Sequence, residues 1–176
     1  MQEPKELYDL DFYKSLEGEK AVEERLKGRL PIIEIAGHPF FVDVNMGLLR
    51  PKDNFASLGL DMVNGGHWNE ATQERTFYYD KRSMDEVKTS ASGKQMPNHI
   101  VLVTVPGLRT LDPVGIARKQ GLDPKTYLND KPFRMFSTAK VTTFREQKQL
   151  DKVRKQFSGN PDHDTKTMNK STKRKP

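Results

Sequence analysis

Cysteine is absent from the 176 residues of this chain. Its absence excludes disulfide bonds, cysteine-based zinc sites, iron–sulfur clusters and thiol nucleophiles. Long hydrophobic runs are also missing, since no apolar segment approaches the ~20 residues that cross a bilayer. Residues 1–10 carry acidic side chains and no apolar stretch, so no secretory signal is predicted. We therefore expect a soluble, cytoplasmic protein with no membrane partner.

Strongly apolar side chains are scarce. Leu, Ile, Val and Phe together make up 40 residues, about 23% of the chain, which is slightly above the roughly 20% below which chains tend to stay disordered. The length suits one domain, with part of the chain outside it. We predict a loosely ordered N-terminus over residues 1–14, a single domain over residues 15–157 and a disordered basic tail over residues 158–176.

The excess positive charge lies near the C-terminus. Residues 151–176 contain eight Lys and Arg against three Asp, whereas the first 150 residues contain 22 basic and 21 acidic side chains. After Phe157 the only sizeable apolar side chain is Met168, so burial cannot offset an ordering cost of roughly 1–2 kcal/mol per residue. The candidate nucleic-acid-binding residues of this tail are Lys166, Lys170, Lys173, Arg174 and Lys175.

Two interpretations of the tail stay open. A few Lys and Arg contacts would hold nucleic-acid phosphates weakly and in a salt-sensitive way. Alternatively, the tail only solvates the protein and contacts no particular partner. The second interpretation is favoured because the tail has no aromatic residue to stack on bases.

Short extended segments dominate the centre of the chain. Residues 31–36 and 40–44 are rich in β-branched and aromatic side chains around a Gly37-containing turn, which predicts a hairpin. Residues 48–50 and 76–80 are expected to be strands, as is the most apolar segment, 99–105, which is typical of a central strand. Two further candidate strands cover residues 134–136 and 139–144.

Helix signals flank and interrupt these segments. Ser15 is predicted to cap a first helix that ends near Gly28. The pairs Asp112-Pro113 and Asp123-Pro124 predict two short helices, and residues 145–157 a charged C-terminal helix. The fold class is therefore α+β: a mainly antiparallel sheet of about five to seven short strands, with an N-terminal helix, one inserted pair of short helices and a C-terminal helix.

Candidate metal and catalytic residues are few. No two histidines have the spacing of three or four residues that places both imidazoles on one helix face, so we predict neither a metal site nor a cofactor. His67 and Trp68 follow two glycines and are candidates for lining a small pocket, although a tryptophan that anchors a loop over the core is the favoured interpretation. Asp43 is interpreted as a surface or turn-capping residue rather than a general base.

One stretch has the spacing of a DNA-binding helix-turn-helix. Over residues 116–127, Ala117 would let two helices cross closely and Gly121 would allow the sharp turn. Gln120 stands where an apolar residue would face the core, and Pro132 stops the second helix early. A glycine-capped helix with a short turn is therefore favoured. No phosphate loop, nucleophile elbow or paired carboxylates are present, so no enzyme is predicted.

Parts of the chain resemble a group of known proteins. Residues 30–44, Leu49-Arg50 and residues 111–118 are similar to small uncharacterised proteins of bacterial mobile genetic elements, over roughly residues 20–130. These motifs are structural and no activity accompanies them, so no functional residue is carried over. The resemblance implies a role near DNA.

Three functions follow as hypotheses. The first is a non-enzymatic accessory protein of a mobile element that associates weakly with nucleic acid through its basic tail. The second is a protein-interaction module whose contact surface is formed by exposed aromatics of the first hairpin and of residues 77–79. The third is an enzyme with a site around Asp43, His67 and Trp68, which we favour least.

Overall fold

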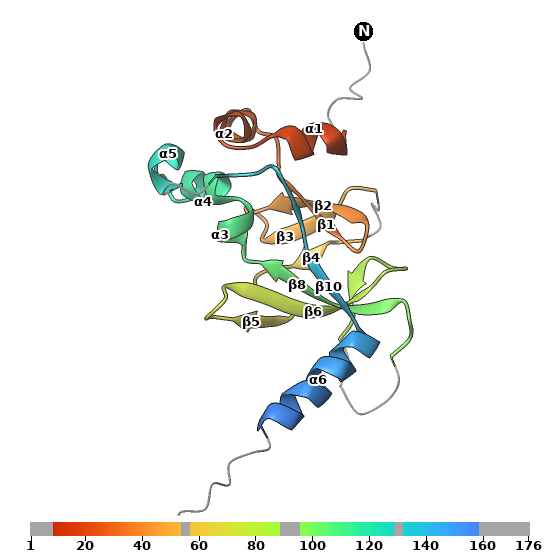
Figure 1. Cartoon of the computed structure of the whole chain (residues 1–176). Coiled ribbons are helices and arrows are strands. Elements are labelled where there is room, and N and C mark those ends of the chain that lie inside the picture. Colours follow the sequence, from red (N-terminus) through yellow and green to blue (C-terminus); the bar gives the residue numbers. More distant parts are fainter. Residues whose placement is uncertain (1–8, 54–56, 89–95, 129–131, 159–176) are drawn as a thin grey trace, which may run out of the picture. The chain divides into compact units, whose positions relative to one another are not determined.

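The computed structural model describes residues 9–53, 57–88, 96–128 and 132–158. The chain divides into two compact units, Met1–Phe144 and Arg145–Pro176. In the first unit, the described residues form two five-stranded sheets with short helices (Figure 1). The predicted α+β class with mainly antiparallel pairing is confirmed. The sequence predicted one sheet of five to seven strands, whereas the described residues form ten strands in two sheets. The difference arises because several strands are only two or three residues long, too short to give a sequence pattern.

The first sheet has the strand order β4-β3-β2-β1-β9. Its centre is the predicted hairpin, which pairs Ile35 with His38 across the two-residue turn Ala36-Gly37. Both turn residues have positive φ, 51° and 85°, as a hairpin turn matching the right-handed strand twist requires. The parallel pair is that between β1 and β9. The bounds are β1 Ile32–Ile35, β2 His38–Asp43, β3 Leu48–Pro51, β4 Leu60–Asp61 and β9 Phe136–Thr138.

The second sheet is antiparallel throughout, with the order β10-β8-β6-β5 and β7 paired to β6. β8 lies between β6 and β10, which confirms that this most apolar segment is a central strand. Its buried residues Val101, Val103 and Val105 alternate with half-buried ones. The bounds are β5 His67–Asn69, β6 Glu74–Asp80, β7 Asp85–Glu86, β8 Ile100–Pro106 and β10 Lys140–Thr143.

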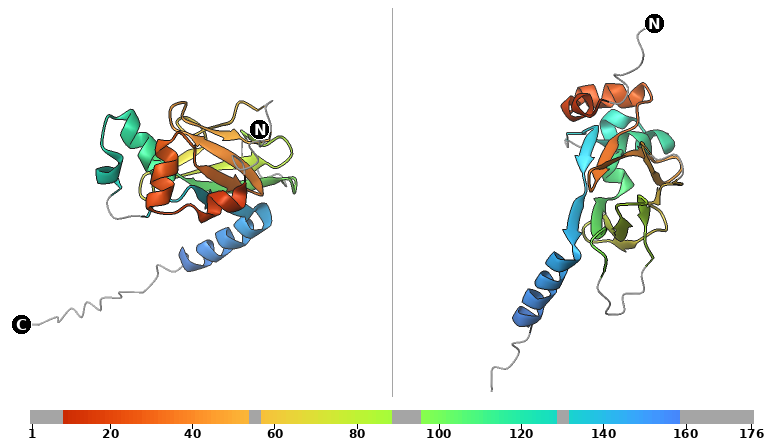
Figure 2. Two further views of the ribbon diagram at one scale, coloured as in Figure 1. Left: turned by 90° about the horizontal axis from the view of Figure 1, so that it is seen from above. Right: turned by 90° about the vertical axis from the view of Figure 1, so that its right-hand side faces the viewer.

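One apolar core joins the two sheets. It contains Ile33 and Phe40 from the first sheet together with Phe77 and Val103 from the second. The strands β9 and β10 follow one another along the chain, with the buried Ala139 between them, so a single stretch forms an edge of both sheets (Figure 2).

A second apolar cluster lies on the helical side of the first sheet. There Tyr13 of α1 (Leu10–Ser15), Val22 of α2 (Glu19–Leu26) and Val114 of α4 (Pro113–Lys119) pack with Ile32 of β1. Residues 10–14 were expected to be loosely ordered, but they belong to α1 because the apolar cluster takes up Tyr13. Ser15 ends α1 instead of capping a helix, and Gly18, with φ of 63°, precedes α2.

The inserted helices begin as predicted. Asp112 accepts a hydrogen bond from the Gly115 N–H at the start of α4, and Asp123 accepts one from Lys125 N–H at the start of α5 (Pro124–Tyr127). A further short helix, α3 (Leu108–Leu111), precedes them. Gly121 has φ of 70° after α4, and α5 has only four residues, which agrees with a glycine-capped helix rather than a helix-turn-helix.

The C-terminal helix is α6 (Phe144–Ser158). The expected single domain over residues 15–157 thus extends past the end of the first unit, and the expected tail over residues 158–176 lies beyond Ser158 outside the described residues. Among the helices in the described part of the chain, none has the length and apolar character to cross a membrane.

Candidate functional site

The predicted phosphate-binding residues of the tail, Lys166, Lys170, Lys173, Arg174 and Lys175, lie outside the described residues. The charge of the second unit is nevertheless fixed by its composition. Residues 1–144 contain 20 Lys and Arg against 20 Asp and Glu, whereas residues 145–176 contain ten against four. The boundary between the two compact units is therefore also the boundary between a neutral unit and one that carries the whole net charge of +6.

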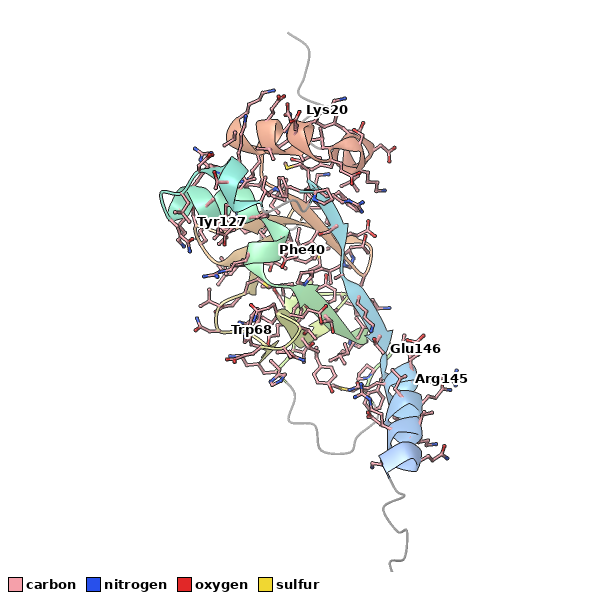
Figure 3. The ribbon with its side chains drawn as sticks, turned by 60° about the vertical axis from the view of Figure 1, so that its left-hand side comes forward. Lys20, Phe40, Trp68, Tyr127, Arg145 and Glu146 are labelled. Carbon is pink, nitrogen blue, oxygen red and sulfur yellow. The ribbon has the colours of Figure 1, made fainter. Side chains whose placement is uncertain are left out.

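The helix α6 arranges part of this charge. At 3.6 residues per turn, the positions of Arg145, Lys148, Lys152 and Lys155 fall on one side of the helix, which we call the basic stripe. Leu150 and Val153 fall on the opposite side. At the same pitch Glu146 lies about 100° from Arg145 around the axis. Both residues are labelled at the start of the helix in Figure 3. Four of the five basic residues of α6 thus lie on one side, and the fifth, Arg154, lies near Leu150 on the other side.

His67 and Trp68 point to opposite faces of β5, as consecutive strand residues do. His67 is exposed. Trp68, which is labelled in Figure 3, is half-buried. The Arg75 guanidinium lies 5.4 Å from the centre of the Trp68 ring. A Cβ atom added at Gly107 would lie 2.8 Å from the ring carbon Cη2. Trp68 therefore packs on the turn after β8, and Gly107 leaves room for its ring.

Arg75 is a structural residue that the sequence analysis did not identify. It is buried on β6 and donates hydrogen bonds to the carbonyl of Val63, at 3.0 Å, and to that of Gly65. It thereby holds the glycine-containing loop that leads into β5. The alternation Arg75, Phe77, Tyr79 on the inward face of β6 is the signal that would have placed it inside.

Asp43 caps the turn after β2. Its Oδ1 accepts hydrogen bonds from the N–H groups of Asn45 and Met46, each at 3.1 Å, and its Oδ2 lies 3.0 Å from Arg50 Nε. The turn-capping interpretation is confirmed. Asp43 lies in the first sheet and His67 in the second, and the hydrogen bonds recorded for the described residues do not connect them.

The expected aromatic surface is exposed only in part, since Phe41 and Tyr78 are half-buried. Phe40, Phe77 and Tyr79 are at most 5% exposed, because strand alternation directs them into the core between the sheets. The Tyr79 hydroxyl is 2.8 Å from His38 Nδ1. Burial, reinforced by the charges of Asp85 and Asp80, raises the pKa of the Tyr79 phenol well above its usual value. This His–Tyr contact joins the two sheets and was not predicted.

A cleft of about 680 Å³ opens beside α3, α5 and β9 in the first unit. Its floor includes the buried Leu111 and Phe133. Among the described residues that line it, every charged side chain is an arginine. The lining residues that carry charge, hydroxyl or aromatic groups are Arg109, Thr110, Tyr127, Phe133, Arg134, Phe136, Ser137 and Thr138.

A smaller hollow of about 440 Å³ shares Leu128, Pro132 and Phe133 with this cleft. Its other lining comes mainly from α2 and includes Glu19 and Glu23 as well as Lys125. The two hollows therefore differ in charge. Of the two, the larger one has arginines and no carboxylate among its described lining residues.

Metal ligands do not gather in the described part of the chain, where no cluster of three His, Asp or Glu side chains has the arrangement to hold an ion. Comparisons of this chain with protein-family models, with curated proteins and with solved structures found no match. Any function must therefore be argued from the chemistry of the described surfaces and from the charge distribution.

Proposed function

We propose that this chain is a non-enzymatic accessory protein that binds nucleic acid nonspecifically through its second unit, residues 145–176. The observation that carries the proposal is the separation of charge: the first unit is neutral, and the unit that begins at Arg145 carries the entire net charge of +6. An origin in a mobile element is part of this proposal and rests on the sequence resemblance alone.

The basic stripe supports binding to phosphates. Arg145 and Lys155 are ten residues apart, so the stripe is about 15 Å long at 1.5 Å per residue. Each Lys or Arg that neutralises a phosphate releases a counterion, and the logarithm of affinity falls by about 0.9 per contact for each tenfold rise in salt. The stripe alone supplies four such contacts and the tail contains five more basic side chains.

The contacts are with the backbone rather than with bases. The cations of α6 and of the tail alternate with glutamines, serines and threonines, and no aromatic residue follows Phe157. Stacking on unpaired bases therefore contributes little. We expect similar affinity for duplexes of unrelated sequence. The protein-interaction alternative has less support, because Phe40, Phe77 and Tyr79 are in the core, and Phe41 and Tyr78 are only half-buried.

The test is fluorescence anisotropy with a labelled duplex of arbitrary sequence at several salt concentrations. The variant K148Q/K152Q/K155Q removes three charges of the basic stripe. The matched control K20Q/K81Q/K88Q removes three exposed lysines of the first unit. We expect the stripe variant to lower the salt slope by about 2.7, and deletion of residues 159–176 to lower it further.

The control variant should keep the affinity and slope of the unaltered protein. Equal losses in the stripe variant and the control would mean that charge anywhere on the protein suffices. Unchanged binding after both changes to the second unit would refute the proposal.

A further inference from the structure

We propose that the arginine-lined cleft beside α3, α5 and β9 binds a small organic phosphate with a planar, largely apolar body, of which a mononucleotide is the simplest probe. The cleft lies wholly within the first unit. Its ligand is therefore separate from the nucleic acid that we assign to the second unit.

Charge is the first reason. Among the described residues that line the cleft, the charged ones are Arg109 and Arg134. The nearby carboxylate of Glu17 is already paired with Arg134, so the charge of Arg109 stays available to an anion. Arg109 is exposed, and its side chain forms no hydrogen bond or ion pair with any described residue, which leaves its guanidinium donors available. Arginine presents these donors in a planar fork that matches two oxygens of a phosphate.

The second arginine is held in place by the fold. Glu17 Oε1 accepts hydrogen bonds from Arg134 Nε at 3.0 Å and from Nη2 at 2.9 Å. This pair holds the guanidinium group beside β9. The third nitrogen, Nη1, does not bond to Glu17. A doubly charged phosphate monoester has enough charge and enough acceptor oxygens to engage both arginines.

Hydroxyl groups provide the neutral contacts. Thr110, Tyr127, Ser137 and Thr138 all line the cleft. None of these side chains makes a hydrogen bond within the part of the chain that the structure describes. Hydroxyls both donate and accept, so they suit the oxygens of a phosphate and of a sugar.

The floor and walls provide the apolar contacts. Leu111 and Phe133 are buried beneath the cleft, and the rings of Tyr127 and Phe136 are half-buried at its sides. The volume of about 680 Å³ falls in the range of roughly 300–1,000 Å³ that is common for small-molecule sites. The arginines and hydroxyls can thus contact the phosphate, and the apolar floor and walls can contact the planar body. The adjacent hollow, which contains Glu19 and Glu23, would repel the same ligand.

The experiment is isothermal titration of the full-length protein with AMP, inorganic phosphate and adenosine. We expect AMP to bind most tightly, phosphate more weakly, and adenosine at least tenfold more weakly than AMP. Arg109→Gln and Arg134→Gln should each weaken AMP binding tenfold or more. The matched control Arg82→Gln removes an exposed arginine in the turn after β6 and should leave it unchanged.

Two further measurements separate this site from the second unit. K148Q/K152Q/K155Q should keep the AMP affinity of the unaltered protein, and R109Q/R134Q should keep its duplex affinity. Melting temperatures within about 2 °C of the unaltered protein show that each variant is folded. The proposal is overturned if AMP does not saturate the protein at millimolar concentration, if adenosine binds as well as AMP, or if R109Q and R82Q bind AMP equally.

Discussion

Arg25 of α2 and Asp112 at the start of α4 form a buried ion pair. Arg25 Nη2 lies 2.9 Å from Asp112 Oδ2, and Nε donates to both carboxylate oxygens at 3.0 and 2.9 Å. Arg25 is 6% exposed and Asp112 is fully buried. The same carboxylate accepts the Gly115 N–H at 2.8 Å, so one side chain both caps α4 and joins it to α2.

Asp112→Ala should therefore cost much more stability than loss of a helix cap alone. Breaking a buried pair leaves an uncompensated charge and typically costs about 3–5 kcal/mol, a large part of a total of about 5–15 kcal/mol. Asp123→Ala is the control, because Asp123 caps α5 in the same way but is exposed and should cost only about 1 kcal/mol. Urea unfolding measures both. Equal costs would show that the ion pair adds nothing to the cap.

Gly115→Ala should destabilise the protein, although alanine normally favours a helix by about 0.5–1 kcal/mol. A Cβ atom at this position would collide with the Asp112 carboxylate and lie 2.7 Å from Arg25 Nη2. In the Asp112→Ala background the collision is relieved, so the alanine should cost less there. Urea unfolding of the two single variants and the double variant measures this coupling. Additive effects of the two substitutions would contradict the close packing.

Tyr79→Phe should change how stability depends on alkaline pH. The pKa of the Tyr79 phenol is raised in the fold, so its neutral form favours folding. That contribution is complete below the ordinary tyrosine pKa of about 10 and is lost above it, by up to about 1.4 kcal/mol per pH unit. Unfolding free energies between pH 8 and 11 should fall more steeply for the unaltered protein than for Tyr79→Phe. Parallel curves would show that the buried phenol does not contribute.

The same substitution removes the hydrogen bond between the Tyr79 hydroxyl and His38 Nδ1. At neutral pH we expect Tyr79→Phe to lower the unfolding free energy by about 1 kcal/mol. The ring itself stays in the core, so no cavity term adds to this loss.

Asp61→Asn should reveal an acid-sensitive turn. Asp61 Oδ1 accepts hydrogen bonds from the N–H groups of Asn64, at 2.9 Å, and Val63, at 2.8 Å, and these bonds lower the pKa of its carboxyl group. Because this pKa is lowered in the fold, the ionised carboxyl group of Asp61 stabilises the fold above the ordinary pKa of about 4. This stabilisation is lost as the pH falls. The unaltered protein should exceed Asp61→Asn in stability at pH 7, and the difference should shrink toward pH 3. Thermal melting across this range measures it, and a constant difference would contradict the assignment.

Local chemistry made several elements predictable. The hairpin of β1 and β2 follows from β-branched residues on both sides of a short turn, and Asp112-Pro113 and Asp123-Pro124 start helices because each aspartate accepts a nearby backbone N–H. The α1 helix was missed because its six residues carry little periodicity, and it is Tyr13 in the second apolar cluster that stabilises it. Helices as short as this have little stability of their own, so local sequence preferences alone do not predict them.

The amino-acid sequence by itself determined the absence of thiol chemistry, the α+β class and the concentration of positive charge after residue 144. These properties depend on composition and on neighbours a few residues apart. Only the tertiary structure decided that the strands form two sheets around one core, that Arg25 meets Asp112, and that Arg109 and Arg134 line one cleft. The residues of each pair are far apart along the chain. They meet because the burial of apolar side chains positions the helices and strands that carry them. Patterns of neighbouring residues do not specify this packing.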